Sequence, residues 1–197
     1  MNILALTRTT APTVEPVSLA LAKQHLRVDH NDEDDLITEY IASARAWVES
    51  FLERSLIRQT WQMILDEFPA AGENIELRMP PAYDLVSFQY LDDDGDATTV
   101  DAAYYDSILA VDCGIITLAS GQAWPVPGDY PGPVRISYRT GYGTAATDVP
   151  ADIRRAVRTM VEHQYRTRGP VAVGTIASQM PFSIMEDLAQ HKVWRMG

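Results

Sequence analysis

The spacing of apolar residues predicts two helices in the first quarter of the chain. Residues 16–28 begin with Pro16 and offer Ser18 as the N-cap of a short helix. From residue 32 onward, apolar side chains recur at steps of three and four, which is the spacing of an amphipathic helix. These are Leu36, Ile37, Tyr40, Ile41, Ala44, Trp47, Val48, Phe51 and Leu52. Four acidic residues at 32–35 suit the start of this helix, because negative charge there is favoured by the helix dipole.

The period changes from 3.6 to 2 at about residue 57. Short β-patterned segments follow one another, separated by turn residues, which is typical of an antiparallel β unit of six to eight strands. The segments are TWQMILDEF, NIELRM, LVSFQYL, TTV, SILAV, IITL and PVRISYRTGYG. Helical spacing returns after Pro150, on a face with Ile153, Val157 and Val161, and Gly169-Pro170 ends this third helix.

These elements predict an α+β fold, in which a helical bundle carries an inserted antiparallel β module and an extended C-terminal tail. Amphipathic helices on both sides of the β segments must pack on each other, because neither apolar face is stable alone. We expect N-terminal bundle helices in residues 1–56, the β module in 57–148, the third bundle helix in 149–169 and the tail in 170–197. A short helix is expected within the tail, at residues 183–194.

The composition is that of a globular protein, with 46% hydrophobic and 22% charged residues among 197. No apolar run has the length needed to cross a bilayer, and the N-terminus lacks the cationic and apolar regions of a signal peptide. The single cysteine, Cys113, cannot form an intramolecular disulfide, which favours synthesis in the cytoplasm.

The net charge of -11 is spread unevenly. Residues 57–150 carry four basic and fourteen acidic side chains, whereas residues 151–197 carry seven basic and four acidic ones. An acidic middle repels polyanions, and sequence-specific DNA binding usually needs a basic face. The charge therefore argues against a sequence-specific DNA-binding protein.

The stretch YLDDDGDATTV at residues 90–100 could be a calcium loop or a turn. With Gly95 at the sixth position of an EF-hand loop, Tyr90 falls on the first ligand position and Asp101 replaces the glutamate at the twelfth. The flanking segments are also strand-like where an EF-hand needs helices. Asp94-Gly95 between β-patterned segments instead indicates a hairpin, because glycine supplies the positive φ of its turn.

No catalytic motif stands out. The histidines at 25, 30, 163 and 191 show no metal-ligand spacing, and GxSxG is absent. Two alternatives remain open: a small hydrolase with an Asp/His site assembled from distant residues, and a ligand-binding β module for which Trp124 is the pointer. No cofactor or metal is expected.

The order of these elements resembles the head-tail connector, or adaptor, proteins of long-tailed bacteriophages and of phage-like gene transfer agents. The likeness starts with PVSLALAKQHLRVDHNDEDDLITEYIASARAWVESFLERSLIRQTWQMILDEFP and continues through YLDDDGDATTV, Trp124-Pro125, ISYRTGYG and VPADIRRAVRTMVEHQYRTRG. It covers nearly the whole chain.

The resemblance implies a structural, non-enzymatic protein in the neck of a virion or phage-like particle. There it would form a ring, commonly twelvefold, under the capsid portal and extend the DNA channel. The partners implied are the portal ring, other copies of the chain, a tail-side connector or stopper protein, and double-stranded DNA bound without sequence specificity; no membrane is implied.

Three sets of residues are candidates for such assembly. Docking to the portal is assigned to apolar residues of the tail: Met180, Pro181, Phe182, Ile184, Met185, Leu188, Val193 and Trp194. The alternative for this set is a final helix packed on the protein's own bundle. Contacts between ring neighbours are assigned to charged residues: Asp32, Glu33, Asp34, Arg154, Arg155 and Arg158. The channel or tail-side surface is assigned to the aspartates of the hairpin tip: Asp92, Asp93, Asp94 and Asp96.

Overall fold

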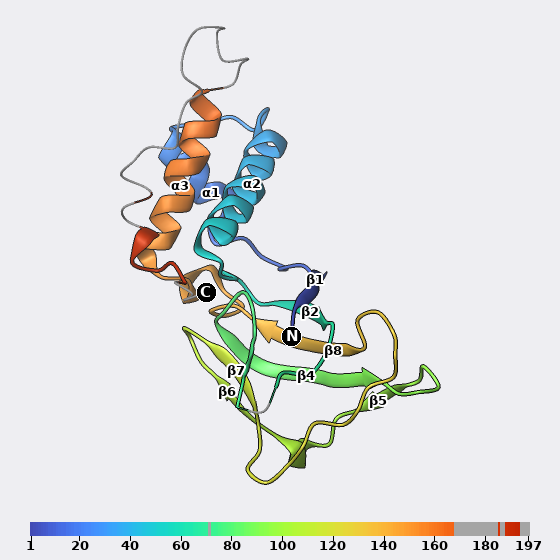
Figure 1. Ribbon diagram of the computed structural model, residues 1–197. Helices are drawn as coiled ribbons and strands as arrows, with labels where there is room; N and C mark the ends of the chain where they lie inside the picture. Colours follow the sequence, from blue (N-terminus) through green and yellow to red (C-terminus); the bar gives the residue numbers. More distant parts are fainter. Residues whose placement is uncertain (71, 168–184, 186–187, 194–197) are drawn as a thin grey trace, which may run out of the picture. The chain divides into compact units, whose positions relative to one another are not determined.

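The computed structural model describes residues 1–70, 72–167, 185 and 188–193 (Figure 1). Two compact units make up the chain. The β unit consists of residues 1–12 and 58–142, and the helical unit of residues 13–57 and 143–197.

The β unit contains two antiparallel sheets. Its strands are β1 (Ile3–Thr10), β2 (Gln59–Leu65), β3 (Ile75–Glu76), β4 (Ala82–Leu91), β5 (Ala97–Thr99), β6 (Tyr105–Leu109), β7 (Gly114–Leu118) and β8 (Val134–Thr140). The larger sheet has the order β1-β2-β8-β4-β5 and the smaller one β3-β7-β6. A short 3₁₀ helix, η1 (Ala102–Tyr104), precedes β6.

Alternate residues of these strands form one apolar core. Its buried members are Met63, Leu65, Ile75, Leu77, Ala82, Phe88, Val100, Ile116, Val134, Ile136 and Tyr138. Tyr138 is fully buried, and its hydroxyl accepts a hydrogen bond of 3.1 Å from the backbone N–H of Arg78. Burial raises the pKa of the Tyr138 hydroxyl well above its usual value, so this group stays neutral.

The helical unit contains α1 (Leu19–Leu26), α2 (Asp34–Leu52) and α3 (Ala151–Arg166), with the 3₁₀ helix η2 (Ala146–Asp148) before α3. Ser18 caps α1 by accepting a hydrogen bond from the N–H of Leu21 at 3.3 Å. Figure 1 shows α2 and α3 side by side. The buried apolar residues of α2 are Ile37, Ile41, Ala44, Val48 and Leu52, all from the predicted apolar face. Those of α3 are Ile153, Ala156, Val157, Met160 and Val161, of which all but Ala156 follow the predicted spacing.

The predicted α+β architecture of a helical bundle with an antiparallel β module is confirmed. One boundary differs from the expectation. The sequence pattern places residues 1–56 with the helices, but residues 1–12 belong to the β unit, where β1 pairs with β2 from Ile3 opposite Leu65 to Thr10 opposite Thr60. The alternation in this strand is weak because its second half, Thr7–Thr10, is polar and exposed. Most of the expected tail lies outside the described residues.

Candidate assembly surfaces

The aspartate run forms the turn between β4 and β5, as the hairpin prediction requires. Gly95 has a φ of 83°, and its N–H donates to the carbonyl of Asp92 at 3.0 Å. The two strands pair from Gln89 opposite Thr99 to Leu91 opposite Ala97. Within the described part of the chain, no group of three or more His, Cys, Asp or Glu side chains could hold a metal ion.

Asp92 is the residue that organises this turn. Its carboxylate accepts hydrogen bonds from the N–H groups of Asp94 and Asp96, at 3.1 and 3.0 Å, and from the Thr98 hydroxyl at 3.0 Å. The bond from the Asp96 N–H is the main cause that holds the pKa of the Asp92 carboxyl below its usual value. Asp92 is therefore needed for the turn itself, which sequence reasoning did not foresee.

The loop at residues 127–133 packs against the base of the hairpin. Gly128 donates its N–H to the carbonyl of Leu91 at 2.9 Å, and the Tyr130 hydroxyl donates to the carbonyl of Asp93 at 3.3 Å. The approach is so close that a Cβ on Gly128 would lie 2.2 Å from the carbonyl oxygen of Asp92. The side chains of Asp93, Asp94 and Asp96 remain exposed on this braced turn.

Trp124 lies over the core of the β unit. Its ring stacks on Phe68, with centroids 5.0 Å apart and planes 10° apart, and meets Phe88 edge-on at 5.8 Å. The Phe68 ring thus covers one face of the indole. Trp124 is therefore part of the packing around the core of the β unit.

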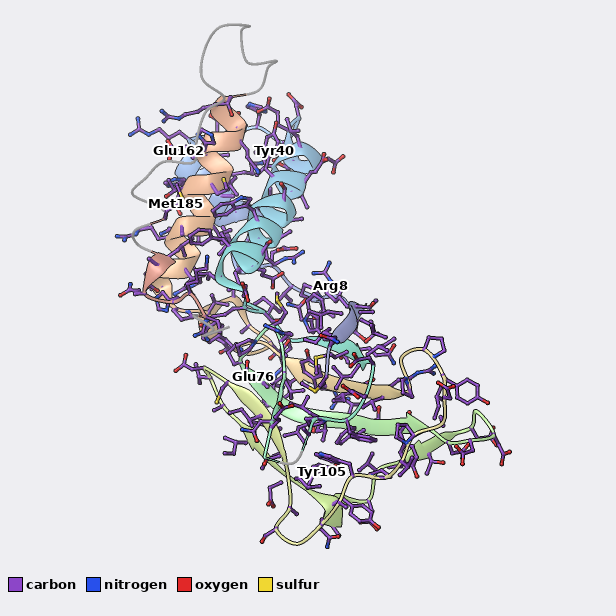
Figure 2. All side chains as sticks on the ribbon, in the orientation of Figure 1. Arg8, Tyr40, Glu76, Tyr105, Glu162 and Met185 are labelled. Atoms are coloured by element: carbon purple, nitrogen blue, oxygen red, sulfur yellow. The ribbon has the colours of Figure 1, made fainter. Side chains whose placement is uncertain are left out.

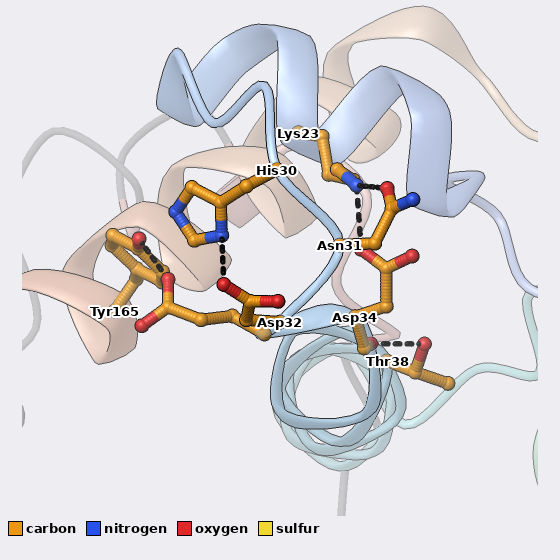
Figure 3. A network of polar contacts seen from close by, with 8 residues as sticks. Lys23, His30, Asn31, Asp32, Asp34, Thr38 and Tyr165 are labelled. Atoms are coloured by element: carbon orange, nitrogen blue, oxygen red, sulfur yellow. Dashed lines mark hydrogen bonds and ion pairs between the residues drawn. The ribbon is translucent and has the colours of Figure 1, made fainter.

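The acidic start of α2 is tied to its neighbours by polar contacts (Figure 3). The Lys23 ammonium contacts Asp34 at 2.6 Å and Asn31 at 2.7 Å. At the carboxyl end of α3, the Tyr165 hydroxyl donates to Glu33 at 2.5 Å. Asp32 is 3.8 Å from His30, and its side chain is 93% exposed. Asp32 is therefore the member of this set most open to a second molecule.

The arginines predicted for ring contacts follow the first turns of α3. Arg154 donates from Nε to the carbonyl of Val149 at 3.1 Å, which ties it to the segment before the helix. Arg155 is exposed, whereas Arg158 is partly buried. The structure thus brings together neither the acidic and basic sets nor all members of either set at one open surface.

The described part of the tail lies on the helical unit. Leu188 is fully buried, and the N–H of Val193 donates to the carbonyl of Leu52 at 3.1 Å. Met185 is partly buried. The other predicted docking residues, Met180, Pro181, Phe182, Ile184 and Trp194, lie outside the described residues. For Leu188, the alternative of packing on the protein's own bundle fits the observed burial.

A buried ion network at the core of the helical unit was not predicted from the sequence. Arg45 donates to Glu15 at 2.7 Å and to Glu49 at 2.9 Å, and the second oxygen of Glu49 accepts the N–H of Leu56 at 2.9 Å. The Arg45 and Glu49 side chains are only 9% and 4% exposed. Burial lowers the pKa of Arg45, but the hydrogen bond to Glu15 and the charge of Glu49 raise it further, so the guanidinium stays charged.

Two histidine–carboxylate pairs join segments of the helical unit. His25 of α1 contacts Glu162 of α3 at 3.0 Å, and Figure 2 shows Glu162 projecting from that helix. His191 forms a short contact with Asp152 at the start of α3. Each pair connects two parts of the fold, which is a structural use of these side chains.

The chain is similar to known proteins both in sequence, over part of its length, and in fold. Residues 16–94 match the family model described as phage gp6-like head-tail connector protein, which confirms the resemblance expected from the sequence over that part of the chain. No curated protein sequence matches the chain. None of the helices in the described residues has the length and apolar character needed to cross a membrane.

Solved structures with the same fold cover 98% of this chain and 98% of their own chains. One is described as the neck of an empty GTA particle computed with C6 symmetry, at 24% identity and a TM-score of 0.81. A second is the virion of a native gene transfer agent particle, with the same identity and TM-score. A third is the neck of a native GTA particle computed with C12 symmetry, at 21% identity and a TM-score of 0.79. The likeness of fold therefore includes both units.

Proposed function

We propose that this chain, whose residues 16–94 match the head-tail connector family, is a structural adaptor in the neck of a phage-like particle. The family match carries the proposal, because it spans α1, α2 and the strands up to β4 and so includes parts of both units. The fold shared with chains of gene transfer agent particles, over 98% of the length, supports it. The adaptor acts by assembly and not by catalysis.

The adaptor forms a ring of copies beneath the capsid portal. A similar fold occurs in a particle neck computed with C12 symmetry, which supports twelve copies in the ring. Ring symmetry multiplies a modest contact of one copy into a stable attachment. The opposite side of the ring then provides a surface for a tail-side connector or stopper protein.

Asp32 and Arg155 are the charged residues best suited to join neighbouring copies, because both are exposed. Asp32 and Arg155 lie at opposite ends of the pair formed by α2 and α3. Tyr165, which contacts Glu33 next to Asp32, is ten residues after Arg155, and this separates the two by about 15 Å along the axis of α3. Rotation about a ring axis joins points at equal height along that axis. Pairing of Asp32 with Arg155 therefore requires the helix pair to lie across the axis.

A charge swap tests this pairing. Asp32→Arg or Arg155→Asp alone should weaken ring formation on the portal, and the double variant should restore it, because the attraction is re-formed with opposite signs. Ring formation is measured by sedimentation of the adaptor with portal rings. Equal ring formation by all four proteins would exclude this contact, and Glu39→Arg on the exposed face of α2 is the matched control.

The β unit supplies a surface along which DNA can pass. It carries five basic and thirteen acidic residues, and the exposed Asp93, Asp94 and Asp96 add charge to a turn that does not need their side chains. A wall with negative charge repels the phosphate backbone and lets it slide without sticking. Replacing these three aspartates by lysine should lower the yield of particles that release their DNA while leaving ring formation intact. Normal DNA release would place these aspartates away from the channel.

A further inference from the structure

Residues 188–193 are the last segment of the chain that the structure describes, and they contact the end of α2. The backbone N–H of Val193 donates to the carbonyl of Leu52, the last residue of α2, at 3.1 Å. Nε of Arg54 donates to the carbonyl of His191 at 2.5 Å. The Lys192 ammonium lies 5.0 Å from the centroid of the Phe51 ring.

A second set of contacts fastens the same segment to the start of α3. One carboxylate oxygen of Asp152 accepts a hydrogen bond from the Gln190 side chain at 3.2 Å and also contacts Nε2 of His191. Partial burial raises the pKa of the Asp152 carboxyl, but hydrogen bonds from His191 and from the N–H of Ile153 lower it below its usual value. Figure 1 shows this segment next to the first turns of α3.

Residues 188–193 make several polar contacts with the helices, but little of the segment is buried. Leu188 is fully buried, whereas Ala189, His191, Lys192 and Val193 are partly exposed and Gln190 is exposed. The other contacts named above are hydrogen bonds, the contact of His191 with Asp152 and a cation–π contact, and water can replace the hydrogen-bond partners when the segment leaves. Such a segment opens locally at a small fraction of the cost of global unfolding.

We propose that residues 188–193 are an autoinhibitory latch, in which the helical unit holds Leu188 and Val193 until the adaptor meets the portal. This proposal rests on the proposed function. Leu188 is fully buried and cannot contact another protein while the segment lies on the protein's own helices, whereas Val193 is held through its backbone N–H and is partly exposed. Opening of the latch at the portal would expose Leu188 there. In the free chain the closed latch keeps Leu188 covered, which limits premature association between free copies.

Asp152→Ala tests the latch from the side of the helical unit, without altering the segment. It removes the acceptor shared by Gln190 and His191. Glu162→Ala is the control, because it removes a histidine–carboxylate pair of the same kind, between α1 and α3. Amide hydrogen exchange of the full chain should show Val193 protected in the original protein and in the control, and about tenfold faster exchange in Asp152→Ala. Equal exchange of Val193 in all three proteins would overturn the latch.

Binding to purified portal rings of the same particle tests the inhibitory role. Asp152→Ala should associate with the portal several-fold faster than the original protein, because a larger fraction of the chain is open, whereas the control should associate at the original rate. Faster exchange at Val193 combined with an unchanged or slower association rate would overturn autoinhibition while leaving the proposed function intact. A complete lack of portal binding by all three proteins would overturn the proposed function and the inhibitory role together.

Discussion

Asp92 fixes the turn between β4 and β5 through three hydrogen bonds to one carboxylate. The sequence predicted the turn from Asp94-Gly95 but did not single out Asp92. Five aspartates occur within residues 92–101, and only the folded loop reveals which of them faces the free N–H groups. The signal that could have identified it is an aspartate two residues before another turn residue, as in an Asx turn.

Replacing Asp92 should loosen this turn. Asp92→Ala is expected to lower the melting temperature by a few degrees, because the N–H groups of Asp94 and Asp96 lose their acceptor. Asp93→Ala is the matched control, since the Asp93 side chain is exposed and its contact with Tyr130 uses the backbone carbonyl. Calorimetry of both variants checks the prediction, and equal melting temperatures would contradict it.

The Asp92 carboxyl should also leave a signature in the pH dependence of stability. A carboxyl whose pKa is lower in the folded state adds stability above its unfolded pKa of about 3.9, and this stability is lost as the pH falls through the folded pKa. The difference in melting temperature between the original protein and Asp92→Asn should therefore be constant from about pH 5 to 7 and shrink below about pH 4. A difference that grows on acidification would contradict this account.

Glu49 should be one of the most sensitive residues of the helical unit. Glu49→Ala leaves the buried Arg45 guanidinium short of a partner and the Leu56 N–H without its acceptor. Removing one member of a buried ion pair typically costs about 3–5 kcal/mol of unfolding free energy. Urea unfolding should show a loss of this order, against less than about 0.5 kcal/mol for Glu39→Ala on the exposed face of α2.

The elements of the fold could be predicted where the apolar spacing is regular. α2 has its buried apolar residues at the steps predicted from the sequence, and Ser18 caps α1 as expected. β1 was missed because Thr7–Thr10 carry no alternation of apolar and polar residues and because the partner strand, β2, lies about 50 positions later. Pairing of that kind depends on contacts distant in sequence, which no local pattern contains.

The junction of α2 with α3 can be tested at the level of single hydroxyl groups. Tyr165→Phe removes the hydrogen bond to Glu33 that ties the end of α3 to the start of α2, and should cost about 1 kcal/mol. Tyr40→Phe on α2 removes a hydroxyl of the same type, for comparison. Thermal unfolding of the two variants gives the difference, and an equal effect of both would show that the Tyr165 bond adds nothing to stability.

At the scale of the whole molecule, the sequence predicted an α+β fold but not the ion network that stabilises the helical unit. Arg45 and Glu49 read as ordinary charged residues of an amphipathic helix, because their partner Glu15 lies before α1 and the N–H of Leu56 lies after α2. The assembly residues were the hardest to predict. Glu33, Asp34 and Leu188 have partners or burial within this chain, and the sequence alone could not distinguish such residues from Asp32.

The assembly of this chain as a ring on the portal is the proposal on which the others depend. The most direct measurement is cryo-electron microscopy of the purified chain mixed with portal rings of the same particle. We expect a closed ring of the chain on one side of the portal, with twelve copies and an open central channel. A chain that stays monomeric in the presence of portal rings, or that binds without forming a closed ring, would contradict it.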